Sequence, residues 1–205
     1  MLEKLAKQTA VYGISTIAVR FLSYLLTPVF TRVFEPEAYG IVTDVYALIP
    51  FALVVLTMGL ESAYFRFAAK ADAAAAAAGG TEGEIAARAR AGKRRLFATA
   101  WGVTLLAASL FFLLTAFGRE RVAEWMGEAY VAHPEYVLLV AAVVWFDVAA
   151  CLPFSRLREQ GRAMTFVGIK ALGVVVNVAL AIGFALAGLY GTPFGVGWVF
   201  VANLI

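Results

Sequence analysis

The chain has 205 residues, of which 62% are hydrophobic and 15% are charged, and its mean hydropathy is +0.83. Soluble domains are about 45–50% apolar and about 25% charged, so a soluble fold of this length could not bury its apolar surface. The formal net charge is +3, but the basic residues lie in the breaks between apolar runs rather than in one patch, so we expect no nucleic-acid partner. These features predict an integral membrane protein.

Apolar runs of about 20 residues, which cross ~30 Å of hydrocarbon, predict the membrane-spanning helices. Five complete runs cover residues 9–30, 39–64, 96–117, 136–154 and 163–190, and a sixth begins near residue 194 and is still incomplete at Ile205. The first run is too long for the apolar part of a signal peptide, and no cleavage site follows it. We therefore expect an all-α membrane protein, a bundle of transmembrane helices with five complete and a sixth started, in one transmembrane domain over residues 1–205.

Basic residues in alternate loops predict the orientation of this bundle. The N-terminus, the second loop and the fourth loop hold most of the Lys and Arg, so we expect them on the cytoplasmic side of a multi-pass inner-membrane protein. The second loop, residues 68–95, is low in complexity and includes the alanine run 73–78, which predicts a partly helical or disordered segment. In the third loop, Val122, Trp125, Met126 and Ala129 have the spacing of a short helix lying in the membrane interface.

Polar residues along one face of the first run predict that this face does not contact lipid. Thr16, Arg20 and Thr27 share that face. An arginine near mid-membrane costs about 3 kcal/mol on insertion scales, so we expect Arg20 to face an aqueous cavity or a buried anion. The alternative is that Arg20 pairs with a carboxylate, Asp44 or Glu61, and holds two helices together.

The later runs also contain charged and amide residues. Glu61 belongs to a polar stripe in the second run, where Pro50 should kink the helix and Asp44 lies about a quarter turn away. Lys170 and Asn177 share a small, polar face of the fifth run, which fits either a cavity wall or a packing seam between helices.

Asp147 is the remaining intramembrane charge, and two interpretations of it stay open: a site for a coupling ion, H+ or Na+, or a salt-bridge partner of Lys170. Cations at Arg20 and Lys170, with few acidic residues beside them, suit a ligand that carries phosphate. The expected substrate-binding residues of the cavity are Arg20, Lys170, Asn177, Glu61, Thr16 and Thr27, with Asp147 and Asp44 for ion coupling or ion pairing.

Motifs of soluble enzymes are absent from the sequence. It contains no P-loop, no dinucleotide-binding glycine pattern, no HExxH, no GxSxG and no cluster of His, Cys or Asp, and Cys151 is the only cysteine. With a single histidine, the chain lacks obvious acid–base groups. We therefore expect neither an enzyme nor a cofactor or metal site.

Four short segments carry a resemblance to a known family. They are LTPVFTR at residues 26–32, EPEAYG at 35–40, GLESA at 59–63 and PFSRLR at 153–158. In this order they resemble the polysaccharide biosynthesis proteins, the oligosaccharide flippases of the multidrug/oligosaccharidyl-lipid/polysaccharide (MOP) exporter superfamily. The resemblance covers about residues 2–68 and 150–205, and the alanine-rich second loop departs from the short loop usual in the family.

The resemblance implies a transporter of two six-helix lobes that open alternately and move an isoprenoid-phosphate-linked oligosaccharide to the outer leaflet. It implies that the chain is the first lobe of a protein roughly twice as long, which should not transport alone, and that Arg20 occupies the position of a cavity arginine. The implied partners are the lipid-linked oligosaccharide, membrane lipids, and the polymerase and glycosyltransferases of the pathway. Two alternatives remain: a small-molecule antiporter of the same superfamily, and a membrane-embedded glycan-processing enzyme or scaffold.

Overall fold

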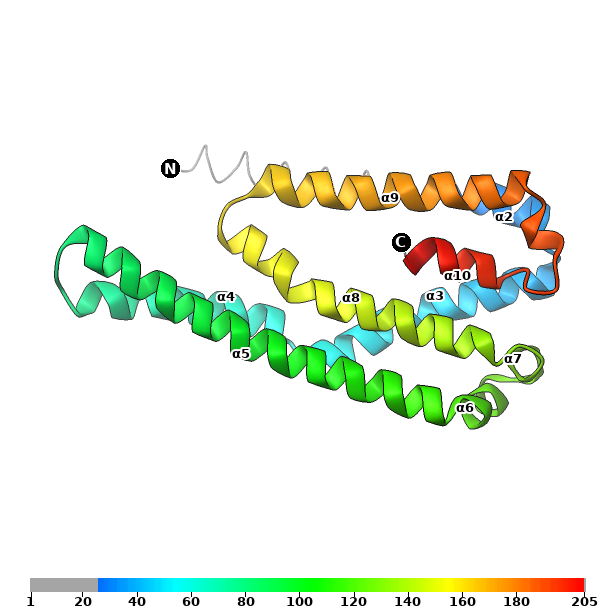
Figure 1. Ribbon diagram of the computed structural model, residues 1–205, viewed down its shortest axis with the longest axis horizontal. Coiled ribbons are helices and arrows are strands. Elements are labelled where there is room, and N and C mark those ends of the chain that lie inside the picture. The colour runs from blue at the N-terminus through cyan, green and yellow to red at the C-terminus, as the bar shows by residue number, and fades with distance from the viewer. Residues whose placement is uncertain (1–25, 205) are drawn as a thin grey trace.

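The computed structural model describes residues 26–204, and these residues contain helices and no strands. The elements are α2 (Thr27–Val33), α3 (Pro36–Thr57), α4 (Leu60–Ala77), α5 (Glu82–Phe117), α6 (Arg119–Met126), α7 (Glu128–Val131), α8 (Glu135–Glu159), α9 (Ala163–Leu186), a 3₁₀ turn η1 (Leu189–Gly191) and α10 (Gly197–Leu204). Figure 1 shows them as an elongated bundle of long helices. Most of the first predicted span, residues 9–30, lies outside the described residues.

Four segments are long and apolar enough to cross a membrane: Pro36–Ala77, Glu82–Phe117, Glu135–Glu159 and Ala163–Leu186. They contain the second, third and fourth predicted spans and most of the fifth, which ends at Leu186 rather than at residue 190, and α10 lies within the predicted start of the sixth. The expected all-α membrane bundle is therefore confirmed. Helices α5 and α8 are longer than their apolar runs, because charged residues at the ends of these spans continue the helix, whereas α9 is four residues shorter than its run.

The second predicted span, residues 39–64, is divided into two helices. Helix α3 begins with Pro36, whose fixed φ suits the first position of a helix, and it continues through Pro50. The chain then breaks at Met58 and Gly59, which both adopt left-handed conformations with φ of 49° and 67°. Glu61 therefore lies in the first turn of α4, where the helix dipole favours a negative charge.

Residues 68–95 form a helical hairpin rather than a disordered segment. The alanine run continues α4, as expected from the high helix propensity of alanine, and Gly79 and Gly80 make the turn with positive φ. Thr81 and Glu84 then form a reciprocal capping box that starts α5. At 1.5 Å per residue, the 36 residues of α5 extend about 54 Å, well beyond a bilayer core of about 30 Å. Figure 1 shows the α4–α5 hairpin projecting past the end of α8.

The predicted short helix of the third loop is present as α6, with Val122 and Met126 packed against the core and Trp125 exposed. It ends at Gly127, which has a φ of 121°, so Ala129 belongs to the separate turn α7. The apolar side of α6 closes one end of the bundle over α3, α5 and α8.

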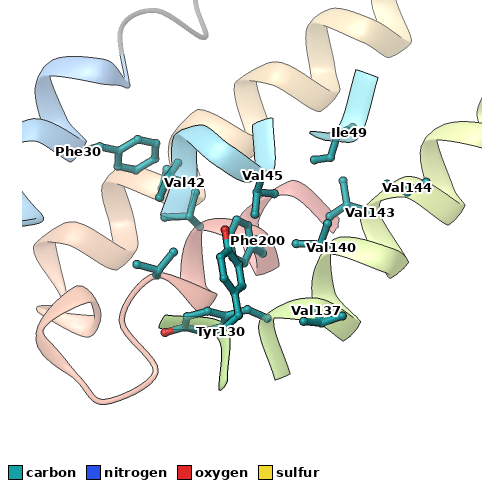
Figure 2. Packing of buried hydrophobic residues seen from close by; sticks show 14 of the residues in the cluster. Phe30, Val42, Val45, Ile49, Tyr130, Val137, Val140, Val143, Val144 and Phe200 are labelled. Carbon is teal, nitrogen blue, oxygen red and sulfur yellow. The ribbon is translucent and has the colours of Figure 1, made fainter. Parts of the chain in front are cut away.

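Helix α8 is the most buried of the four spanning segments. Its valines pack against Val42 and Val45 of α3 and Phe200 of α10, as Figure 2 shows. Two indole hydrogen bonds join it to α5: Trp101 donates to the carbonyl oxygen of Ala149 at 2.9 Å, and Trp145 donates to Ser109 Oγ at 3.1 Å. By contrast, Ala181 is the only buried residue of α9 in the described structure. The apolar, exposed face of α9 suits contact with lipid or further protein.

Candidate functional site

The predicted cavity residues of the first helix, Thr16 and Arg20, lie outside the described residues. Thr27 lies at the start of α2 and is exposed, and its carbonyl oxygen accepts a hydrogen bond from Thr31 Oγ1 at 3.0 Å. The site described below is therefore built from α3, α4, α8, α9 and α10.

Glu61 forms an ion pair with Arg158, which joins the start of α4 to the last turn of α8. The second carboxylate oxygen of Glu61 accepts a long contact of 3.7 Å from Cys151 Sγ. Arg158 also donates from Nη2 to Ser155 Oγ at 3.3 Å, and Ser155 Oγ donates to the carbonyl oxygen of Cys151. The predicted substrate residue Glu61 thus has a cationic protein partner that the sequence did not indicate.

Two aromatic rings lie beside the guanidinium of Arg158. Its carbon Cζ is 5.6 Å from the ring centre of Phe65 in α4 and 5.7 Å from that of Phe166 in α9. Such contacts between a cation and an aromatic face are attractive at this range. Arg158 is consequently the point where α4, α8 and α9 meet through side-chain contacts.

A second group of charges ties the hairpin to the same end of α8. Lys93 Nζ lies 2.7 Å from both Asp72 Oδ2 of α4 and Glu159 Oε1 of α8. Arg156 lies over the ring of Phe97 at 4.6 Å and makes no ion pair within residues 26–204. Packing and ion pairing therefore fix α5 between α4 and α8 at this end of the bundle.

Lys170 and Asp147 both lie at exposed positions on apolar helices. Lys170 Nζ is 4.4 Å from the ring centre of Phe154 in α8. Within the described part of the chain the two side chains form no ion pair, although Asp147 lies close enough to Lys170 to interact with its charge. Both side chains are thus oriented away from the buried core of the described helices.

Asn177 belongs to a chain of amide hydrogen bonds across three helices. Its Nδ2 donates to the carbonyl oxygen of Ala202 at 2.8 Å and to Asn203 Oδ1 at 3.1 Å. Asn203 Nδ2 in turn donates to the Tyr46 hydroxyl at 2.6 Å. Asn177 therefore attaches α9 to α10 and, through Asn203, to α3. The sequence analysis did not single out Asn203, although an amide side chain in an otherwise apolar run could have indicated a polar contact between helices.

Asp44 is exposed on α3 near the hydroxyl of Tyr130, which donates to the carbonyl oxygen of Ile41 at 3.4 Å. Burial raises the pKa of Tyr130 to about 12, and the negative charge of Asp44 adds to the shift. Asp44 is thus near the α7 end of the bundle, whereas Glu61 and Arg158 are at the end that carries the hairpin.

The pockets among the described helices include one of about 330 Å³, partly open and lined mainly by apolar residues of α3, α5, α6 and α8, and one of about 380 Å³ between α5 and α8. Neither is lined by a predicted site residue. Residues 26–204 also contain no group of three or more His, Cys, Asp or Glu side chains that could hold a metal ion.

Comparison with known proteins identifies the family. A family model described as "Polysaccharide biosynthesis protein" matches residues 5–205. The chain belongs to this family. The match includes the alanine-rich hairpin that departs from the expected short loop, and it confirms the resemblance drawn from the four short segments. No curated protein and no solved structure matched the chain. The chain is thus a multi-pass membrane protein of the polysaccharide biosynthesis family.

Proposed function

We propose that this polysaccharide biosynthesis family member is one lobe of a transporter that moves an isoprenoid-phosphate-linked oligosaccharide to the outer leaflet by alternating access. The observation that carries the proposal is the family match over residues 5–205, on a chain with four membrane-length apolar helices. A flippase needs an interior that receives a charged headgroup. We assign the exposed Lys170 and Asp147 and the partly exposed Glu61–Arg158 pair to the surface of such an interior in the intact transporter.

Lys170 supports an anionic substrate. It lies about 10 Å from the start of α9 at 1.5 Å per residue, and a cation at that depth is costly unless an anion or water accompanies it. A phosphate would offset that cost, as it would for Arg20 in the first helix. Asp147, at the middle of α8, is the group we assign to ion coupling, with H+ or Na+ as the ion.

The orientation follows from the basic residues. We place the N-terminus, the α4–α5 hairpin and the α8–α9 connection on the cytoplasmic side of the inner membrane, because these segments hold most of the Lys and Arg. Lipid-linked oligosaccharide would then enter at the end of the bundle that carries Arg158. The polymerase and glycosyltransferases of the same pathway are the expected protein partners.

Depletion of the intact gene product in its native cell tests this function. We expect surface polysaccharide to fall and the lipid-linked oligosaccharide to accumulate in the inner leaflet, where an externally added glycosidase cannot reach it. Lys170→Met in the intact gene product should reproduce the accumulation at normal abundance, and Ile169→Met should serve as its control. Normal surface polysaccharide together with raised sensitivity to small cationic drugs would instead indicate the antiporter.

A further inference from the structure

The Arg158 side chain contacts residues of three helices, which together form the Arg158 site. The Glu61 carboxylate of α4 forms an ion pair with Arg158, and Ser155 Oγ of α8 accepts a hydrogen bond from it. The ring of Phe65 in α4 and the ring of Phe166 in α9 lie beside its guanidinium group. An arginine guanidinium is planar and carries five N–H donors, so it suits two oxygens of one carboxylate or one phosphate. Arg158 already binds one such anion, the Glu61 side chain.

The Arg158–Glu61 pair is partly exposed. The side chains of Arg158 and Glu61 are 34% and 37% exposed, values between those of the two carboxylate partners of Lys93, Glu159 at 14% and Asp72 at 53%. An anion from outside can therefore reach Arg158. Glu61 also has other stabilisation for its charge, because it lies in the first turn of α4 and contacts Cys151 Sγ. Glu61 keeps these contacts when Arg158 turns to another anion.

The surroundings select the kind of anion. Phe65 and Phe166 supply apolar surface next to the cation, which suits a phosphate joined to a hydrocarbon chain better than a free, fully hydrated phosphate. We propose that Arg158 binds the phosphate of an isoprenoid-linked substrate at the entry end of the bundle, and that Glu61 holds the guanidinium until that phosphate replaces it. This inference rests on the proposed function and adds an entry site to it.

Binding of farnesyl phosphate to the intact gene product in phosphatidylcholine nanodiscs tests the assignment. The key variant is the double substitution Glu61→Gln with Arg158→Gln, which removes both charges and so leaves none uncompensated. We expect it to keep wild-type abundance and melting temperature while binding farnesyl phosphate about tenfold more weakly or worse, the loss typical of one strong charged contact. Arg156→Gln removes a cation two residues away and should change affinity less than about twofold, which controls for general electrostatics.

The single variant Glu61→Gln gives a result of the opposite sign. It removes the competing carboxylate, so we expect farnesyl phosphate to bind several-fold more tightly than to the wild type. This gain decides the question even if the double variant is not recovered folded. A purely structural ion pair would instead give a Glu61→Gln protein of low abundance without tighter binding, and that result would overturn the assignment.

Three further outcomes would also overturn it. They are a wild type that does not bind farnesyl phosphate, a double variant that binds as tightly as the wild type, and displacement of the probe by an equal concentration of phosphatidylglycerol, which would assign the Arg158 site to bulk lipid headgroups. Failure of the proposed function is seen separately. Surface polysaccharide that is unaffected by depletion, with Arg158-dependent binding intact, would refute oligosaccharide export and leave the phosphate site standing.

Discussion

Asn203 of α10 donates a hydrogen bond of 2.6 Å to the hydroxyl of Tyr46 in α3, and the same amide group donates to its own helix at the Val199 carbonyl oxygen, 3.1 Å away. Through Asn177 this contact continues into α9. Three helices that are distant in sequence thus share one chain of polar contacts at membrane depth. Water does not compete for these groups in hydrocarbon, so the contacts should contribute to stability.

We predict that Asn203→Ala lowers the free energy of unfolding in detergent by about 1 kcal/mol, somewhat above the average for polar contacts between membrane helices. Tyr46→Phe removes only the hydroxyl and should cost less. The two substitutions should not be additive, because they remove the same hydrogen bond. Thermal unfolding of both single variants and the double variant measures the coupling, and strict additivity would contradict the contact.

A second prediction concerns orientation. A reporter that is active only outside the cytoplasm should be silent when inserted between Gly79 and Gly80 at the hairpin tip, and active when inserted at Gly127 between α6 and α7. Both positions lie at turns with positive φ, so insertion should disturb the helices little. The reverse pattern of activities would invert the assigned sides and move Arg158 to the exit end of the bundle.

The two carboxylates that share Lys93 should differ in their importance. The Asp72 side chain is 53% exposed and that of Glu159 is 14% exposed, although each lies 2.7 Å from Lys93 Nζ. Exposed pairs contribute about 0–1 kcal/mol, so Asp72→Asn should change the melting temperature little. Glu159→Gln should lower it more, since it affects the less hydrated side of the pair. Equal effects of the two variants would show that burial does not control this cluster.

Met58 is the one non-glycine residue with positive φ among the described residues, and its side chain is mostly exposed. A left-handed conformation costs an L-residue about 1–2 kcal/mol, so Met58→Gly should stabilise the protein by about 0.5–1 kcal/mol once the extra chain entropy of glycine is counted. Met58→Ala keeps the strain and serves as the control. A less stable Met58→Gly protein would mean that the methionine side chain, rather than the backbone, determines stability at this break.

The spanning helices could be predicted because a helix that crosses the hydrocarbon needs a long apolar run, and such a run is visible in the sequence of α8. The break at Met58 could not, since methionine is a good helix former and the apolar run continues through it. The start of α5 was readable in the Thr81–Glu84 capping box, although we expected the apolar run to begin only near residue 96.

The site was less predictable because its contacts join distant parts of the chain. The sequence identified Glu61, Lys170, Asn177 and Asp147 as polar residues in apolar surroundings, but it gave no information on which side chains meet. The pairing of Glu61 with Arg158 depends on how α4 packs beside α8. Arg158 itself looked like a topology signal in a basic loop, because α8 extends one turn beyond its apolar run.

Because α5 is long and continuous, a small rotation at one end of the helix moves its other end by a large distance. The helix continues without a break and without a proline from the tip of the hairpin to its end beside α6, and Lys93 and Trp101 connect it to α8. A rotation of only 5° about the end beside α6 would move the tip by about 5 Å, given its length of about 54 Å. Small rotations of α5 thus become large displacements at Gly79 and Gly80, where a spectroscopic label could follow the motion of the helix.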